Sequence, residues 1–311
     1  MKLTGVIVPL VTPFDSEEVF DPKGMEQLVA YVLEQGADAV MPTALTGEGL
    51  LLDETETLAV WDTVFDQVGG RIPVVPAIIS TTTRKAVRLA REAVARGAGA
   101  VMVAPILPEL YAGRSEQDVL AFYSDIANAI TVPIILFNYP SLTGIDFVPE
   151  LVDRLTGIDT IRYIKESSGD IRRVSRLHRL LGDRLTVICG APNVALESLA
   201  LGCTVWITGI MNGAPRSARQ LMQAMQQPNG LALARQIYYR QILPVVDVLM
   251  KNYNPTGTIK ATVRARGVSA GVPRRPGSDV DLQDWKRLIQ LIATIAEQEV
   301  EMEKLLACPG N

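Results

Sequence analysis

The feature that most constrains the fold of this chain is a repeated alternation of short β-branched runs with longer segments of helical periodicity. Val6–Leu10 is the first run, and Lys23–Gln35 follows it with apolar residues at helical spacing. The pattern recurs eight times, and the runs are almost continuously apolar, as strands of a parallel sheet covered by helices must be. Eight such units predict an α/β chain folded as a closed (β/α)8 TIM barrel. The later strands are expected at Ala39–Pro42, Pro73–Ile79, Ala100–Ala104, Pro133–Asn138, Ile161–Lys165, Leu185–Cys189 and Cys203–Thr208.

An open, doubly wound sheet is the alternative to a barrel. It would need a glycine-rich phosphate turn after the first strand, and neither a G-x-G-x-x-G nor a G-x-x-x-x-G-K-[ST] motif occurs in the chain. After about residue 228 the alternation gives way to helical patterns, one of them interrupted near Pro244. We therefore expect a barrel over 1–228 and a C-terminal helical extension over 229–311 that packs on it, the two forming one structural domain.

Composition excludes several classes of function. The net charge is −4, so there is no basic surplus with which to bind nucleic acid. The three cysteines, Cys189, Cys203 and Cys308, show no C-x-x-C spacing, and there is one histidine, so the sequence predicts no transition-metal site. The same cysteine pattern predicts a location in the reducing cytoplasm. No run of about 18 apolar residues is free of charges or helix breakers, which predicts no membrane span.

The chemistry of such a barrel lies at the carboxyl ends of its strands. Lys165 ends the predicted strand Ile161–Lys165, where an apolar environment would lower the pKa of its amine and leave it neutral and nucleophilic. The alternative is a structural lysine paired with Glu166. Of the other lysines, only Lys260 is expected to be partly buried.

Two further positions follow strands. Thr46-Gly47-Glu48 comes after the second strand, where Gly47 allows a tight turn and Thr46 offers a hydroxyl and an amide to a carboxylate. A simple turn is the alternative. Tyr111 follows the fourth strand and could either reach a site or pack as a loop aromatic.

Several segments occur in the order of a known family. The chain resembles the dihydrodipicolinate synthase / N-acetylneuraminate lyase family of class I aldolases in GVIVPLVTPF at 5–14, LTGEG at 45–49, LFNYPSLTG at 136–144, YIKESSGD at 163–170 and LGCTVWITG at 201–209. The resemblance implies that Lys165 forms a Schiff base with a 2-oxo acid, that Thr46 holds the carboxylate of this acid, and that Gly190 and Ile207 line the pocket. It also implies a homotetramer, as a dimer of dimers, and no cofactor, because the lysine imine is itself the electron sink.

Several residues differ from the family pattern at positions that determine which reaction the enzyme catalyses. Phe137 stands where the family has a tyrosine that relays protons to and from the imine. Leu45 replaces a second hydroxyl residue, and Leu142 replaces an arginine that binds the aldehyde substrate of dihydrodipicolinate synthases. Ile106-Leu107 stands in place of an aromatic pair. These replacements predict that the chain is not a true dihydrodipicolinate synthase.

Loss of the phenol raises the question of what carries the protons. Tyr111, Tyr139, Ser167, Thr46, a substrate group or water could do so. Tyr139 is close to Phe137 in sequence, but because side chains alternate along a strand we expect it to face away.

The sequence thus predicts a Schiff-base lyase acting on pyruvate or a related 2-oxo acid by aldol cleavage, water loss or ammonia loss. The rival from another class is a non-catalytic 2-oxo-acid-binding protein, which Phe137 favours and Lys165 opposes. A metal-dependent barrel aldolase is a third alternative; it lacks histidine ligands, so carboxylates alone would have to hold Mg²⁺.

Overall fold

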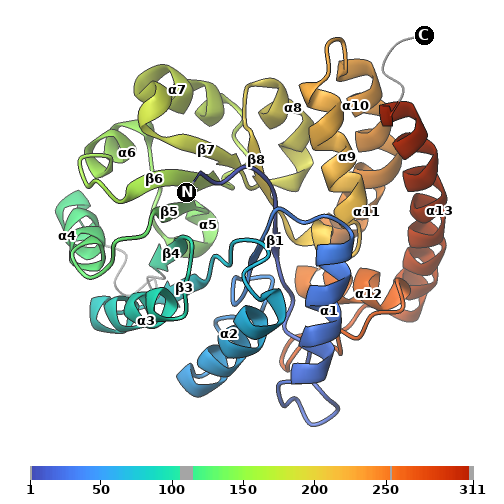
Figure 1. Cartoon of the computed structure of the whole chain (residues 1–311), viewed down its shortest axis with the longest axis horizontal. Coiled ribbons are helices and arrows are strands. Elements are labelled where there is room, and N and C mark those ends of the chain that lie inside the picture. The colour runs from blue at the N-terminus through green and yellow to red at the C-terminus, as the bar shows by residue number, and fades with distance from the viewer. Residues whose placement is uncertain (1, 106–114, 253, 308–311) are drawn as a thin grey trace. The chain divides into compact units, whose positions relative to one another are not determined.

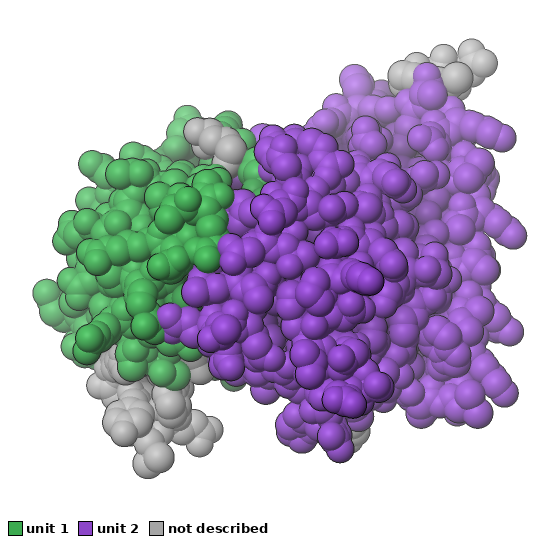
Figure 2. Space-filling model, turned by 60° about the horizontal axis from the view of Figure 1, so that its bottom comes forward, with its two compact units in different colours: residues 1–2, 73–207 green, residues 3–72, 208–311 purple. Residues whose placement is uncertain are grey.

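The computed structural model describes residues 2–105, 115–252 and 254–307, and these fall into two compact units (Figure 2). Unit 1 comprises residues 1–2 and 73–207, and unit 2 comprises residues 3–72 and 208–311. Each unit contains both strands and helices, which are labelled along the chain in Figure 1. The order of elements is the strand-helix alternation of the predicted (β/α)8 class, followed by C-terminal helices.

Unit 1 is built on six parallel strands in the order β8-β7-β6-β5-β4-β3. Its strands are β3 (Ala77–Ser80), β4 (Val101–Pro105), β5 (Ile134–Asn138), β6 (Ile161–Glu166), β7 (Thr186–Cys189) and β8 (Val205–Ile207). Its α-helices are α3 (Thr83–Ala95), α4 (Glu116–Ala127), α5 (Pro140–Thr143), α6 (Pro149–Leu155), α7 (Arg172–Leu181) and α8 (Ala195–Ala200), and short 3-10 turns lie at Gly182–Arg184 and Pro192–Val194.

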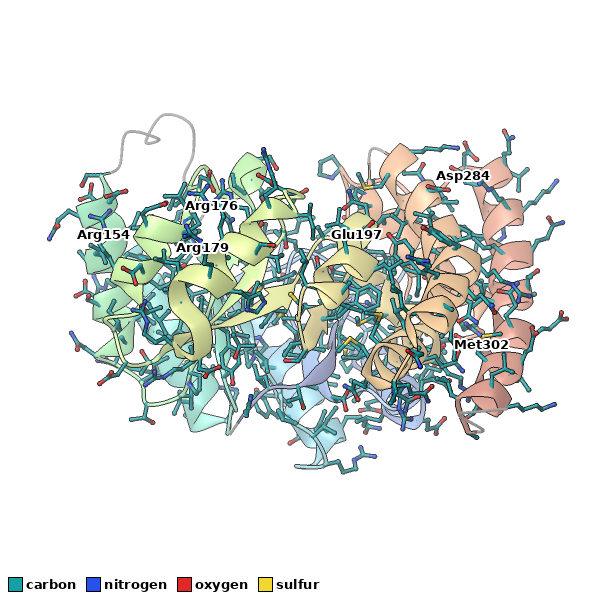
Figure 3. All side chains as sticks on the ribbon, turned by 90° about the horizontal axis from the view of Figure 1, so that it is seen from above. Arg154, Arg176, Arg179, Glu197, Asp284 and Met302 are labelled. Atoms are coloured by element: carbon teal, nitrogen blue, oxygen red, sulfur yellow. The ribbon has the colours of Figure 1, made fainter. Side chains whose placement is uncertain are left out.

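Apart from the exposed Arg162 on β6, the strands of unit 1 are largely buried on both faces, because the helices are amphipathic. On α7, Val174 and Leu177 are buried, whereas Arg176 and Arg179 are exposed and point outward (Figure 3). The near-continuous apolar runs of the strands therefore lie where a covered parallel sheet needs them. The sequence did not predict α5, a single turn that begins at a proline and ends at Gly144 in the left-handed conformation.

Unit 2 contains the first two strands, which pair in parallel, and the C-terminal helices. Its elements are β1 (Gly5–Pro9), α1 (Pro22–Glu34), β2 (Ala39–Met41), α2 (Glu54–Val68), the 3-10 turn Gly209–Asn212, α9 (Pro215–Gln226), α10 (Leu231–Ile237), α11 (Leu243–Lys251), α12 (Pro255–Ala265) and α13 (Leu282–Ala307). Helix α2 begins with a capping box, in which Asp53 and Glu56 each accept the other's backbone N–H.

The predicted break in the C-terminal helix falls earlier than Pro244. A π-helical turn spans Tyr238–Ile242 and joins α10 to α11. Proline has no N–H to donate and its ring clashes with the carbonyl four residues before it, so the preceding turn widens. The change in helical geometry is therefore displaced one turn toward the N-terminus.

Helix α13 is held to unit 2 by apolar and polar contacts. Leu288, Ile292 and Met302 are buried, and Figure 3 labels Met302 toward the end of the helix. Glu299 is 3% exposed and accepts hydrogen bonds from the Arg266 guanidinium at 3.0 Å and the Ser217 hydroxyl at 2.7 Å. None of the helices in the described part of the chain combines the length and apolar character that a membrane span requires.

Candidate active site

Lys165 lies at the carboxyl end of unit 1's sheet, between two neighbouring strands. Its Cα is in register with Phe137 on β5 and with Ile188 on β7. Its residue exposure is only 9%, so the amine is held in an apolar environment built by three strands. Its Nζ lies 4.6 Å from the centroid of the Phe137 ring.

Burial is the main reason why the Lys165 amine differs from an ordinary lysine. It lowers the pKa from 10.5 to about 8, against a smaller opposing effect of Cys189. Among the described residues, the amine has no salt-bridge or hydrogen-bond partner. At pH 7.5 a pKa of about 8 leaves about one amine in four neutral, whereas a pKa of 10.5 leaves about one in a thousand. The site therefore supplies the neutral amine that nucleophilic attack on a carbonyl requires.

The alternative interpretation, a Lys165–Glu166 ion pair, is not what the structure contains. Adjacent strand residues point to opposite faces, and the Glu166 carboxylate is bonded instead by the Asn138 amide and the Ser168 backbone N–H, each at 2.7 Å. Burial raises the pKa of Glu166, and these hydrogen bonds oppose the rise. Asn138 also accepts the N–H of Phe147 at 3.1 Å, which fixes its orientation.

Gly190 follows β7 and lies against the Lys165 side chain. A Cβ at this position would be 2.9 Å from Lys165 Cγ and 2.1 Å from Ser167 Oγ. It would also be 2.8 Å from the backbone carbonyl oxygen of Glu166, so no side chain fits there unless the surrounding residues move. The Ser167 hydroxyl is itself buried and has no hydrogen-bond partner within the described parts of the chain. It is thus a free donor and acceptor beside the lysine stem.

The expectation that Tyr139 faces away from Phe137 is wrong. The two ring centroids are 5.9 Å apart in an edge-to-face arrangement, because residues two apart along an extended chain point to the same side. Tyr139 is 38% exposed. Tyr111, like Ile106 and Leu107, lies outside the described residues.

In unit 2, the Thr46-Gly47-Glu48 turn follows β2 and is closely packed. A Cβ on Gly47 would lie 2.6 Å from the Leu10 carbonyl oxygen, and the Gly47 carbonyl accepts the Thr12 hydroxyl at 2.6 Å. Thr46 is half-buried next to Gly209, where an added Cβ would be 3.0 Å from Thr46 Oγ1. Glycine is therefore required at position 47 because a side chain would collide with the Leu10 carbonyl, as well as because of the tight turn that the sequence indicates.

A second buried lysine, Lys260 on α12, is fully buried, where the sequence led us to expect partial burial. Burial lowers its pKa to about 8, while Glu48 opposes the change. In contrast to Lys165, its ammonium is surrounded by partners: the Glu48 carboxylate at 2.6 Å and the Val272 carbonyl at 2.9 Å. Nothing in the sequence around Lys260 identifies Glu48 as its partner, so sequence reasoning missed this pair.

The remaining candidates are apolar or inert. Ile207, the last residue of β8, is fully buried. Cys189 and Cys203 are buried free thiols whose pKa values are raised mainly by burial, which opposes thiolate formation. In the described ranges, no cluster of three or more His, Cys, Asp or Glu residues could hold a metal ion.

Comparison with known sequences and structures identifies the family. The sequence model of the Dihydrodipicolinate synthetase family matches residues 2–295. The chain belongs to this family. Among its relatives are proteins named 4-hydroxy-tetrahydrodipicolinate synthase from Syntrophus aciditrophicus, 34% identical over 290 residues (92% of this chain, 97% of the relative), and from Pelobacter propionicus, 32% identical over 273 residues (88% and 91%).

Solved structures of the dihydrodipicolinate synthetase family confirm the (β/α)8 barrel. A structure described as a putative dihydrodipicolinate synthetase from Pseudomonas aeruginosa has a TM-score of 0.90 and 32% identity, covering 94% of this chain and 100% of its own. The dihydrodipicolinate synthase from Acinetobacter baumannii, described as complexed with pyruvate, has a TM-score of 0.87 and 26% identity (95% and 99% covered). Membership of this family supports an enzyme of the class I, pyruvate-dependent aldolase type.

Proposed function

We propose that this protein is a Schiff-base lyase that acts on pyruvate or a related 2-oxo acid through Lys165. The observation that carries the proposal is the Lys165 amine, which is buried, has a pKa of about 8 and has no salt-bridge or hydrogen-bond partner in the described residues. The pyruvate complex of the Acinetobacter baumannii relative supports the substrate class. The resemblance adds Thr46 as the residue that binds the carboxylate of the 2-oxo acid.

The reaction begins when the neutral amine of Lys165 attacks the ketone carbon and forms a carbinolamine. Loss of the hydroxyl as water gives a protonated imine, which withdraws electrons from the adjacent carbon. In aldol cleavage, a base takes the proton of the substrate hydroxyl, the C–C bond breaks to release an aldehyde, and the imine accepts the electron pair to become an enamine, which is then protonated at carbon. In water or ammonia loss, a proton leaves the adjacent carbon to give the enamine, which expels the protonated leaving group from the next carbon and re-forms a conjugated imine. Hydrolysis of the imine returns the amine and releases the product.

Both dehydration and bond cleavage need a proton carrier within hydrogen-bond reach. Phe137 has no hydroxyl, so the phenol of the family cannot supply it here. We assign this role to Ser167, whose buried hydroxyl has no hydrogen-bond partner among the described residues. The Ser167 hydroxyl and the Lys165 side chain both lie against Gly190. Tyr139 is the second candidate because its ring contacts that of Phe137.

We further propose a reaction other than dihydrodipicolinate synthesis. Leu45 and Leu142 replace the hydroxyl and the arginine that the resemblance associates with that substrate, and both side chains are half-buried in the structure. Apolar side chains at these positions favour a substrate whose second portion is shorter or less polar. If a panel of 2-oxo acids showed that only highly polar sugar acids react, this part of the proposal would be refuted.

The proposal is tested by trapping the imine. The protein is treated with pyruvate and borohydride, and the adduct is located by intact mass and peptide mapping. We expect an adduct on Lys165, none in Lys165→Met, and an unchanged adduct in Lys286→Met, where the lysine is exposed on α13. A folded protein that gives no adduct with pyruvate or longer 2-oxo acids would instead be the non-catalytic binder that Phe137 favours.

The family resemblance also implies a homotetramer. We propose this assembly, which light scattering on the purified protein tests against a chain mass of 33.8 kDa. A mass of one or two chains would refute it.

A further inference from the structure

The turn that carries Thr46 has an unfavourable backbone conformation. Thr43 and Glu48 have φ values of 57° and 56°, in the left-handed region that residues other than glycine rarely adopt. Such residues are strained and persist only when the surrounding structure holds them. The conformation of the turn must therefore be maintained by contacts from elsewhere in unit 2.

The Glu48 carboxylate makes the main contact of this kind. It is buried, with Oε1 2.6 Å from Lys260 Nζ and Oε2 accepting the Arg274 backbone N–H at 2.8 Å. One carboxylate oxygen thus forms an ion pair with α12, and the other accepts a hydrogen bond from the segment that follows this helix. A buried carboxylate with these partners resists rotation, and so does the left-handed residue that carries it.

Lys260 is itself fixed on several sides. Its ammonium donates to the Val272 carbonyl at 2.9 Å and lies 4.4 Å from the centroid of the Phe14 ring. The Arg274 guanidinium lies 4.3 Å from the same ring centroid and pairs with Glu56 at 2.6 Å. The ammonium is therefore fully enclosed and cannot act as a second amine nucleophile.

Helix α12 also lies close to Thr46 through a second residue, Ile259. A Cβ on Gly209 would be 2.5 Å from Ile259 Cδ1 and 3.0 Å from Thr46 Oγ1, so Gly209 fills the space between these side chains. Ile259 and Lys260 are adjacent on α12. One segment of one helix thus contacts Glu48 directly and faces Thr46 across a glycine.

We propose that Lys260 is a positioning residue for the carboxylate of the 2-oxo acid, because its ion pair with Glu48 holds the Thr46-Gly47-Glu48 turn in its binding conformation. This inference rests on the proposed function, in which Thr46 binds that carboxylate. Lys260 does not touch the substrate. Its removal should weaken binding of the 2-oxo acid much more than it slows the chemistry of bound substrate, because Lys165 lies on a different element.

The test is a pyruvate titration of borohydride trapping at Lys165 in the full-length protein. Lys260→Met should raise the half-saturating pyruvate concentration by about tenfold or more while trapping at saturation stays close to wild type. Arg264→Met is the matched control: Arg264 is on the same helix but pairs with Asp279, and its half-saturation should stay within about twofold of wild type. In a Thr46→Val background, Lys260→Met should add little, because both changes act on the same contact.

Two further measurements keep the proposal falsifiable. If Lys260→Met does not fold, because it leaves Glu48 buried without its cation, Glu48→Gln has nearly the same shape and should show the same rise in half-saturation. Equal half-saturation in wild type and in the folded variants, with normal trapping at Lys165, would overturn this inference and leave the proposed function intact. Absence of trapping at Lys165 in the wild-type protein would overturn both.

Discussion

Burial of the Lys165 amine should make the protein less stable than a variant without it, and the difference should depend on pH. A pKa that falls from 10.5 in the unfolded chain to about 8 in the folded protein corresponds to about 3 kcal/mol, since each pKa unit is worth about 1.4 kcal/mol. Well below pH 8 the amine is charged in both states, and the folded protein bears this whole cost. Lys165→Met replaces the amine by an apolar side chain of similar length and removes the cost.

The pH window follows from the direction of this change. Between about pH 8 and 10.5 the unfolded chain binds more protons at Lys165 than the folded protein does, so stability rises with pH in this range. Lys165→Met should therefore be more stable than wild type by up to about 3 kcal/mol at pH 7, and the gap should close by pH 10.5. Lys260 is present in both proteins, so its own titration cancels in the comparison.

Urea unfolding, followed by fluorescence of the buried Trp61 and Trp206, measures this gap at pH 7.0, 8.5 and 10.5. Lys286→Met, which changes an exposed lysine, is the control and should differ from wild type by no more than about 0.5 kcal/mol at each pH. A gap for Lys165→Met of less than about 1 kcal/mol at pH 7, or one that does not change with pH, would refute the argument that burial activates this amine.

Three other substitutions test separate parts of the structure. Gly190→Ala places a Cβ 2.1 Å from Ser167 Oγ, so single-turnover trapping should slow by about tenfold or more in a protein with unchanged circular dichroism, and an unchanged rate would contradict the packing argument. Phe137→Tyr restores a phenol beside the reactive amine, and the turnover rate with an accepted 2-oxo acid should rise by about 10²-fold. If steady-state assays show no gain, another group in the protein already does the work of the missing phenol. Glu299→Ala leaves Arg266, whose side chain is 12% exposed, without its buried partner, so the free energy of unfolding should fall by about 3–5 kcal/mol. A thermal midpoint equal to that of wild type would show that α13 is held by its apolar contacts alone.

Much of the site was predictable because it depends on local pattern. The near-continuous apolar run before Lys165 predicts a covered strand, and the barrel rule then places the lysine at its carboxyl end. The helix over Glu54–Val68 was predictable in the same way, since its capping residues lie next to it in sequence. These features depend on residues that are close together in the sequence, so they can be predicted without knowledge of the fold.

What could not be predicted depends on partners that are distant in sequence. The buried Glu166 carboxylate is bonded by Asn138, which lies 28 residues away. Tyr139 follows Phe137 by two residues where the chain leaves β5, and the two rings lie on the same side of the chain.

The sequence by itself determined the alternation of strands and helices, the strand end occupied by Lys165 and the loss of the relay phenol at Phe137, because periodicity and residue type are local properties. Only the tertiary structure decided which charges are buried and with whom they pair. Glu48 accepts the N–H of Arg274, 226 residues away, and the ammonium of Lys260, so a lysine with an unremarkable sequence context becomes fully buried. Burial and pairing depend on contacts across the whole fold, and it is these contacts that make one lysine reactive and enclose the other.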